Sequence, residues 1–361
     1  MTKTIRSSKP AISVFRVCAL AASMGVFATA TLYFAGAFNG DKVTAKAFVD
    51  LQQGSTVHAG FRRAHAKGLC VSGNFESTGL LSAYSTARVF KQGSTPFIGR
   101  FSIAGNNPTA PDLKAPVRSL AFVVNTATED EWRVAMNTPP VMAVATPDAF
   151  YKQLQALSPD PATGKRDPKK ISAFFKAHPE SKAFNQWKAG YTPANSFATE
   201  RYNSINAFYL HNAQGEKQAV RWQAVPSIND QEVAVLDKQS PDALQQQLIS
   251  QIEKQPVRFD LMFTLADSSD DENNPTIPWP SSREVINAGS LVITDWRFQN
   301  EGACGAQNFD PLVLPNGMSA TADPILRARG AAYAQSYRRR ATETLLNKNK
   351  TGQEGAGDAS N

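Results

Sequence analysis

The chain has 361 residues, of which 42% are hydrophobic and 19% are charged, which is the composition of an ordinary folded protein with a large core. It excludes a disordered chain and, with three cysteines, a small disulfide scaffold. The net charge of +7 comes mainly from residues 1–16, with four basic and no acidic side chains, and residues 324–350, with seven basic and one acidic. Because the rest is nearly neutral, we expect no nucleic-acid partner.

The N-terminal part contains an apolar run at residues 17–38, VCALAASMGVFATATLYFAGAF, with no charged residue. About 20 apolar residues can span a bilayer as a helix. Since residues 1–16 are basic, we predict a membrane anchor that keeps them in the cytoplasm and places the rest in the periplasm, at a bacterial inner membrane. The competing interpretation is a signal peptide cleaved after Ala35-Gly36-Ala37, which leaves a periplasmic or secreted protein.

Residues 41–345 have the pattern of one domain that is rich in strands. Alternating apolar and polar residues predict strands within 66–104 and at 119–125, 132–137, 205–212, 215–225, 257–266 and 290–298. Apolar residues at helical spacing predict helices at 147–157, 171–187, 243–254 and 323–349. The small, polar residues 350–361 predict a disordered tail. Together the elements predict an antiparallel β-barrel with helices before, between and after its strands.

The cysteines Cys18, Cys70 and Cys304 have neither the spacing of a metal site nor the number of a disulfide framework. Cys18 lies in the apolar run. A bridge between Cys70 and Cys304 can form in an exported protein, but two free, buried thiols are the favoured interpretation.

Three short motifs and one longer one stand out along the domain. They are Arg62-Arg63-Ala64-His65-Ala66-Lys67-Gly68, Arg100-Phe101-Ser102, Met136-Asn137-Thr138-Pro139 and Asp323-Pro324-Ile325-Leu326-Arg327-Ala328-Arg329-Gly330-Ala331-Ala332-Tyr333. Each motif alone is common in proteins. In this order, and with Phe150 thirteen residues after Asn137, the set resembles the catalase superfamily over roughly residues 50–342.

The resemblance implies an α+β fold: a catalase-like antiparallel eight-stranded β-barrel with surrounding helices and a C-terminal haem-ligating helix. It implies haem b as the cofactor and Tyr333 as the proximal ligand of the haem iron. Arg329 precedes Tyr333 by one helical turn, and its positive charge would favour the phenolate. The arginines that align with the family's propionate-binding residues are Arg62, Arg100 and Arg340.

On the opposite face of the haem, the resemblance implies a peroxide-cleaving group. His65 is the expected acid–base catalyst, because peroxide cleavage moves a proton from one oxygen to the other. Asn137 is expected to hydrogen-bond the peroxide, and Ser102 to orient His65. Phe150 aligns with a phenylalanine that faces the haem.

The sequence departs from standard catalases at several pocket positions, among them Val117, Met142 and Gly330, which indicate a wider and less polar access route. We therefore expect a short, catalase-related peroxidase that reduces hydrogen peroxide or organic peroxides with a small organic electron donor, through a ferryl intermediate. The alternatives are a true catalase that dismutates hydrogen peroxide, and a haem-binding or redox-sensing protein without turnover. Since catalases form tetramers through arms that this chain lacks, we expect a smaller homo-oligomer.

Overall fold

The structure, a computed structural model, describes residues 43–125, 130–160 and 162–357. Thr44–Asn361 is one compact unit. The basic segment 1–16 and the apolar run 17–38 lie outside the described residues, so the anchor or signal peptide remains a prediction. Within the part of the chain that is described, no helix is both long enough and apolar enough to span a membrane.

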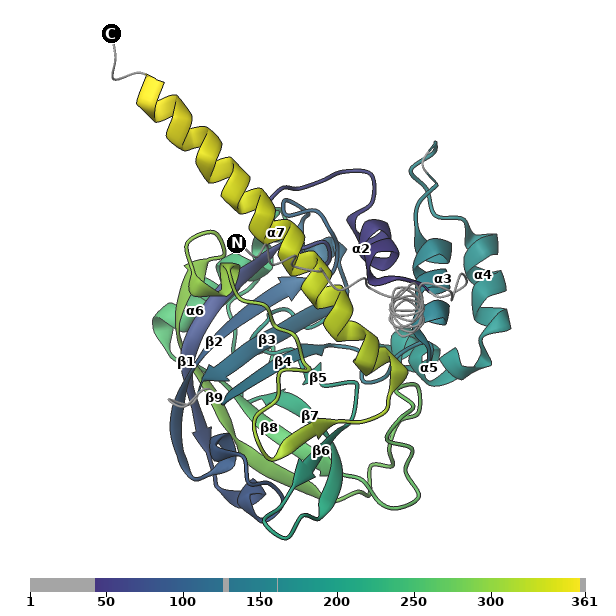
Figure 1. The fold of residues 1–361 in the computed structure, drawn as a ribbon, viewed down its shortest axis with the longest axis vertical. Coiled ribbons are helices and arrows are strands. Elements are labelled where there is room, and N and C mark those ends of the chain that lie inside the picture. Colours follow the sequence, from purple (N-terminus) through teal and green to yellow (C-terminus); the bar gives the residue numbers. More distant parts are fainter. Residues whose placement is uncertain (1–42, 126–129, 161, 358–361) are drawn as a thin grey trace, which may run out of the picture. The chain divides into compact units, whose positions relative to one another are not determined.

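The strands of the described chain form one antiparallel sheet that closes into a barrel (Figure 1). They are β1 (Gly68–Ser77), β2 (Gly93–Ile103), β3 (Arg118–Asn125), β4 (Glu131–Asn137), β5 (Tyr202–Asn203), β6 (Phe208–His211), β7 (Lys217–Pro226), β8 (Val257–Leu265), β9 (Val285–Phe298) and β10 (Met318–Ala320). The order is β10-β6-β7-β5-β4-β3-β2-β1-β9-β8, and β8 also pairs with β7. This last pairing makes a ring of eight strands, with β6 and β10 attached to β7, and confirms the predicted barrel.

The two faces of the barrel wall differ because side chains alternate along each strand. In β4, Trp132, Val134 and Met136 are buried in the barrel interior, where Trp132 packs edge-on against neighbouring aromatic rings. The intervening residues of β4, including Asn137, point outward. The outer face of β2, β3 and β4 is therefore free to carry polar side chains.

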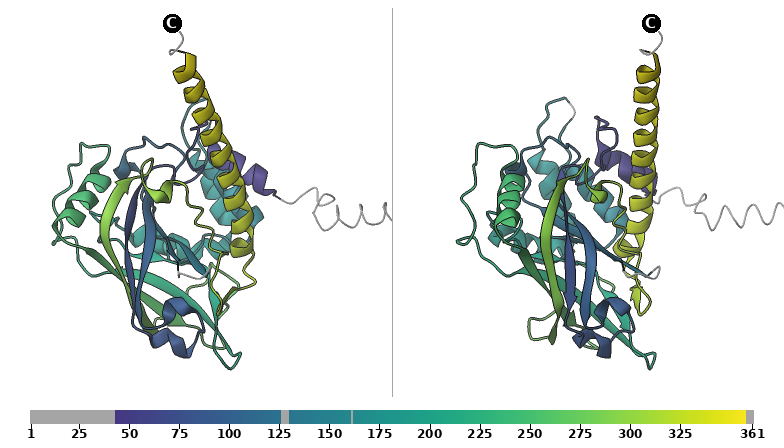
Figure 2. Two further views of the ribbon diagram at one scale, coloured as in Figure 1. Left: turned by 60° about the vertical axis from the view of Figure 1, so that its left-hand side comes forward. Right: turned by 90° about the vertical axis from the view of Figure 1, so that its left-hand side faces the viewer.

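The helices of the described residues lie outside the barrel. They are α2 (Ala45–Gln53), α3 (Pro147–Leu157), α4 (Pro168–Ala177), α5 (Lys182–Gly190), α6 (Ala243–Lys254) and α7 (Pro324–Gly357). The 3₁₀ turns are at Leu80–Ala83, Arg88–Phe90, Asp112–Lys114, Pro179–Ser181 and Ala303–Gly305. Helix α7 runs along the outer face of the barrel and contacts α2 (Figures 1 and 2).

Two predicted helices differ from the observed ones. The segment predicted as one helix at 171–187 is divided into α4 and α5 by the 3₁₀ turn Pro179–Ser181. The cause is Pro179, which lacks an N–H group and disfavours helical backbone at His178. At the other end, α7 continues beyond its predicted end at residue 349 and through residues 350–357, since extending an existing helix adds one hydrogen bond per residue fixed.

A disulfide joins Cys70 on β1 to Cys304 in the 3₁₀ turn that follows β9, so the expectation of two free thiols is wrong. The chain turns back after Phe298, where the Gly302 amide donates to the Phe298 carbonyl. Gly302 then lies so close to Cys70 that a Cβ atom there would stand 2.6 Å from the Cys70 sulfur. This close approach joins residues 234 positions apart, a relation that spacing along the sequence does not reveal.

Replacing both Cys70 and Cys304 by serine is expected to lower the free energy of unfolding by about 2–5 kcal/mol, because the bridge restricts the unfolded chain. Urea denaturation of the variant and the parent under non-reducing conditions measures this difference, and adding reductant to the parent should reproduce it. The denatured, unreduced parent, produced as the full 361-residue chain, should titrate as one thiol, that of Cys18. A result of three thiols would contradict the bridge.

Candidate active site

His65 lies in the turn before β1, with a backbone φ of +55° that is rare outside glycine. Its Nδ1 atom is 3.1 Å from the hydroxyl of Ser119, on the outward face of β3. Ser102, the predicted partner, stands directly opposite Ser119 in the register of β2 and β3. The hydrogen bond with His65 is therefore made by Ser119 on β3 and not by Ser102 on β2. This partner follows from the register of the two strands and cannot be read from the Arg100-Phe101-Ser102 motif.

The environment of His65 strongly disfavours its protonation. Burial, and then the positive charges of Arg100, Arg329 and Arg62, together lower the pKa of His65 from 6.5 to about 4, and a hydrogen bond with the backbone of Ile103 opposes them. The imidazole is therefore neutral near pH 7 and can accept a proton.

Asn137 ends β4 and stands opposite Ser119 in the register of β3 and β4. The Ser119 hydroxyl donates a hydrogen bond to Oδ1 of Asn137. His65 and Asn137, both predicted site residues, are thus joined through a residue that the sequence did not single out.

Tyr333 lies on α7 and packs, as Ile98 and Ala121 do, against a buried cluster formed by Cys70, Val123, Cys304 and Phe309. Arg329, one turn earlier, donates to the Tyr333 hydroxyl at 3.2 Å, as the predicted helical spacing requires. Arg329 also donates to the carbonyl of Ala135 on β4 at 3.1 Å. These contacts orient both side chains of α7 toward the same part of the barrel wall.

The start of α7 is anchored by a buried chain of hydrogen bonds that the sequence did not reveal. Asp323 caps the helix by accepting from the backbone amides of Ile325 and Leu326, at 2.8 and 3.2 Å. Its other oxygen accepts from the Asn206 amide at 2.6 Å, and Asn206 Oδ1 accepts from Arg329 at 2.7 Å. The orientation of Arg329 is therefore set from both ends of the guanidinium.

Arg62 and Arg340 meet at the loop held by the disulfide. Arg62 donates to the carbonyls of Cys304 and Gln307 at 2.9 and 2.7 Å, and Arg340 donates to those of Gly305 and Gln307. Burial lowers the pKa of Arg62 well below its usual value, and the charges of Arg100 and Arg340 lower it further, whereas that of Tyr333 raises it. The three arginines and the tyrosine are thus within electrostatic range of one another.

Arg100, on the outward face of β2, completes this cluster of cations. It donates to the His65 carbonyl at 2.8 Å and to the Gln299 side chain at 2.7 Å. Its Nε atom is buried without a hydrogen-bond partner among the described residues. Burial lowers the pKa of Arg100, and so does the charge of Arg340.

Within the described chain, none of these three arginines forms an ion pair with a carboxylate. Buried cations require anionic partners, and guanidinium groups suit carboxylates. A haem has two propionate carboxylates, and Tyr333 offers the phenol oxygen that iron can take as an axial ligand. The residues present therefore fit a haem. A propionate bound beside Arg100 would explain why the Nε atom of that residue has no hydrogen-bond partner among the described residues.

Phe150 is the predicted site residue that the described contacts do not connect with the others. Its ring lies on α3, 5.4 Å from that of Phe48 on α2, and packs with Val144 and Phe174. It belongs to the helical layer beside α7, and its role toward the haem stays a prediction.

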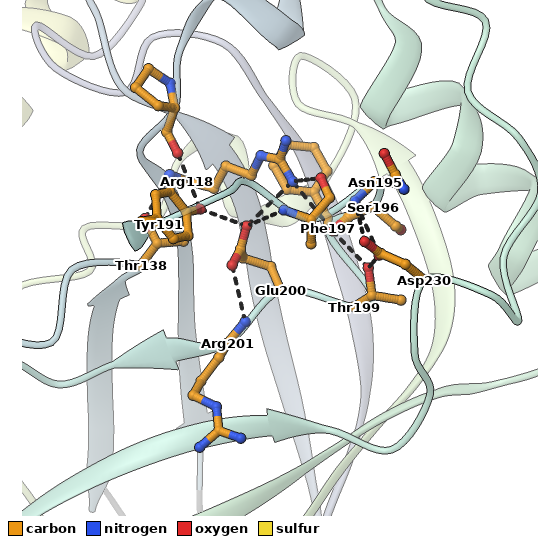
Figure 3. Close-up of polar contacts among 12 residues, drawn as sticks. Arg118, Thr138, Tyr191, Asn195, Ser196, Phe197, Thr199, Glu200, Arg201 and Asp230 are labelled. Atoms are coloured by element: carbon orange, nitrogen blue, oxygen red, sulfur yellow. Dashed lines mark hydrogen bonds and ion pairs between the residues drawn. The ribbon is translucent and has the colours of Figure 1, made fainter. Parts of the chain in front are cut away.

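A second polar network fixes the strand ends that carry Ser119 and Asn137 (Figure 3). Arg118 pairs with the buried Glu200 at 3.4 Å, and the Tyr191 hydroxyl donates to the same carboxylate at 2.7 Å. Burial raises the pKa of Tyr191, and the hydrogen bond and charge of Glu200 raise it further. Arg118 adjoins Ser119 in β3, so this network keeps the strand end in place.

Comparison with known proteins shows which family has this arrangement. The chain matches the catalase family over residues 57–352. A catalase-related peroxidase of Synechococcus elongatus is 39% identical over 286 residues, which cover 79% of this chain and 84% of that protein. One of Mycolicibacterium paratuberculosis is 28% identical over 285 residues, covering 78% and 89%. A solved bacterial catalase has the same fold, with a TM-score of 0.67 at 21% identity over 78% of this chain and 57% of that one.

The closed eight-stranded barrel, with the polar groups of the site on its outer wall and α7 across them, defines a catalase-like α+β protein. The match over most of its length places the chain in the catalase family. It is accordingly an oxidoreductase that acts on peroxide, and membership of the family implies a haem cofactor.

Proposed function

We propose that this protein is a haem peroxidase that reduces hydrogen peroxide or an organic peroxide with two electrons from a small organic donor. The observation that carries the proposal is the combination of a neutral, half-buried His65 beside Asn137 with Tyr333 and three arginines that have no carboxylate partner among the described residues. Two relatives that match over most of both chains are named catalase-related peroxidases, which supports peroxidation over dismutation.

The proximal side of the site is assigned to α7. Tyr333 would bind the iron of haem b through its phenol oxygen, and Arg329, which donates to that oxygen at 3.2 Å, would hold it in place. Arg62, Arg100 and Arg340 would hold the propionates. When bound, the haem supplies the redox-active iron that peroxide oxidises and the donor reduces.

The distal side is assigned to the groups around His65. The neutral imidazole takes the proton from one peroxide oxygen and returns it to the other, so that water leaves. Asn137 orients the peroxide by a hydrogen bond from its side-chain amide. Burial, and then the nearby positive charges, lower the pKa of His65 to about 4, so this base is free at neutral pH.

The function is tested by following oxygen release and donor oxidation by the same sample at millimolar peroxide. A peroxidase oxidises a phenolic donor such as guaiacol and releases little oxygen. Rapid oxygen release without donor oxidation would make the protein a true catalase. Haem uptake with no spectral change on adding peroxide would make it a haem-binding or sensing protein.

We further propose that the domain works outside the cytoplasm, anchored or released at the inner membrane, as a monomer or small homo-oligomer. The apolar run 17–38 supports export, and so does the Cys70–Cys304 disulfide, because such bonds persist in oxidising compartments. Carbonate extraction of membranes distinguishes an anchored chain, which stays in the pellet, from a processed one, and recovery in the cytoplasmic fraction would refute export.

A further inference from the structure

We propose that the disulfide between Cys70 and Cys304 positions the groups that hold the haem propionates, and that its reduction weakens the binding of haem. The inference rests on the proposed function, since it takes the arginine cluster to bind the propionates; this cluster consists of Arg62, Arg100 and Arg340. It follows from one observation. The segment 299–307, which the bridge attaches to β1, accepts hydrogen bonds from all three arginines.

Backbone carbonyls of this segment hold the arginines that come from the two ends of the domain. Arg62 donates to the carbonyls of Cys304 and Gln307 at 2.9 and 2.7 Å. Arg340 donates to the carbonyl of Gly305 and, at 3.2 Å, to that of Gln307. Because the Gln307 carbonyl accepts from both arginines, a displacement of this backbone moves both guanidinium groups.

The third arginine is held by the side chain that begins the segment. Arg100 donates to Oε1 of Gln299 at 2.7 Å, and the Gln299 amide donates to the carbonyl of Ala66 at 3.0 Å. In the hydrogen bonds of the described residues, Arg62 and Arg100 each use only the Nη2 atom. The other nitrogens of each guanidinium can bind a carboxylate, so the segment determines which edge faces the propionate.

The bridge is the covalent connection between this segment and the barrel wall. Cys304 is fully buried and Cys70 is 4% exposed, whereas Glu301, Ala303 and Ala306 are exposed. Most side chains around the 3₁₀ turn therefore contribute little packing against β1. Without the bridge, the position of the three carbonyls would depend mainly on the arginines that they are supposed to hold.

The bridge also lies beside the proposed ligand of the iron. Tyr333 packs against the buried cluster that Cys70 and Cys304 form with Val123 and Phe309. Loss of the covalent bond lets the two sulfur atoms separate, which would loosen this cluster. The bridge therefore supports both the tyrosine and the arginine cluster.

Reduction of the bridge is a two-electron step. A dithiol reductant supplies two electrons and two protons to the sulfur–sulfur bond, which gives the thiols of Cys70 and Cys304, and the dithiol itself becomes a disulfide. If haem binds more tightly to the bridged protein, bound haem must make the bridge harder to reduce by the same factor. One coupling can thus be measured from either side.

The first measurement is the affinity of the full-length protein for gallium protoporphyrin IX, a redox-inactive substitute for haem whose fluorescence reports binding. Replacing both Cys70 and Cys304 by serine should raise Kd by roughly 10- to 100-fold, within the usual range for coupled sites. The parent protein equilibrated with dithiothreitol should show the same increase. Circular dichroism checks that both samples keep the fold, and an unchanged Kd in either would overturn the proposal.

The matched control is Ile252→Ala. Ile252 lies on α6 in the main core cluster, apart from the cluster that contains the bridge. The truncation should lower the free energy of unfolding by an amount similar to the loss of the bridge, but it should leave Kd unchanged. An equal loss of affinity in the two variants would mean that only general stability matters, and the positioning role would be refuted.

The second measurement needs no variant. The parent protein is equilibrated in dithiothreitol buffers of different redox ratio, and alkylation followed by peptide mass analysis gives the fraction of Cys70 and Cys304 that is reduced. The reduction potential of the bridge should be lower in the porphyrin-loaded protein than in the empty one, by about 30 mV for each tenfold difference in Kd. Equal potentials would contradict the coupling, even if the serine variant proved unable to fold.

These measurements separate the inference from the proposed function. If the bridge controls porphyrin affinity but the haem-loaded parent oxidises no donor, the proposed function fails and the coupling stands. If the parent is an active peroxidase and the bridge affects neither Kd nor the potential, the coupling fails and the function stands.

Discussion

Replacing Tyr333 by phenylalanine is expected to leave a folded protein that no longer retains haem. The substitution removes only the oxygen that would bind the iron and that accepts from Arg329 at 3.2 Å. The ring can keep its packing against the buried cluster of Cys70, Val123, Cys304 and Phe309, so the fold should persist. Haem content per chain, measured by the pyridine haemochrome method, and the absorption spectrum of the purified protein check this result.

The matched control is Tyr337→Phe, one helical turn further along α7. Tyr337 is 38% exposed, and its ring lies 5.4 Å from the Arg340 guanidinium. This variant should retain haem at the level of the parent. Normal haem content and an unchanged spectrum in Tyr333→Phe would refute the assignment of Tyr333 as the proximal ligand.

Replacing His65 by alanine should have the largest effect on rate. The variant is expected to keep haem, because the groups assigned to haem binding are on α7 and the arginine cluster. It should lose peroxide cleavage by roughly 100- to 10,000-fold, the usual contribution of a positioned acid–base group. Stopped-flow absorbance after mixing the haem-loaded variant with peroxide, with no electron donor present, measures the rate of peroxide cleavage.

His58→Ala is a suitable control, since the described hydrogen bond of His58 uses its backbone carbonyl, which accepts from the Phe61 amide. It should react with peroxide as the parent does. Equal reactivity of His65→Ala and the parent would remove His65 from the mechanism and favour a haem-binding protein without turnover.

The lowered pKa of His65 also predicts the acid limit of the reaction. The imidazole stays neutral until the pH approaches about 4, so the rate should fall as the pH drops through that value. Below pH 6.5 the unfolded chain binds a proton at this residue that the folded protein does not. The contribution of His65 to the free energy of unfolding should therefore decrease from pH 6.5 to about 4 and change little below it.

The parts of the site that could be predicted from sequence are those carried by short local motifs. The four-residue interval between Arg329 and Tyr333 implies a contact on any helix, and the structure shows it. Ser119 was missed because its role depends on the register of three strands, which places Ser102, Ser119 and Asn137 side by side. The bridge between Cys70 and Cys304 was possible from the sequence but not favoured, because the two cysteines lie 234 positions apart. Asn206 was missed for a similar reason, since Arg329, which donates to it, lies 123 positions away.

The two ends of the described chain meet at the site. Arg63 pairs with Glu343, and Asp50 on α2 accepts from Arg339 on α7 at 2.6 Å. These partners are 280 and 289 residues apart, and the barrel strands β1 to β9 all lie between them. Such distant contacts form late, because closing a long loop costs chain entropy before the contact compensates for it.

The consequence concerns how the protein is made. The residues proposed to hold the haem come from both ends of the domain, with Arg62 before β1 and Tyr333 and Arg340 on α7. If that assignment is right, a folding chain can complete its barrel strands before the haem site exists. Haem would then bind only after α7 has docked, and chains truncated before Arg340 would remain without the cofactor.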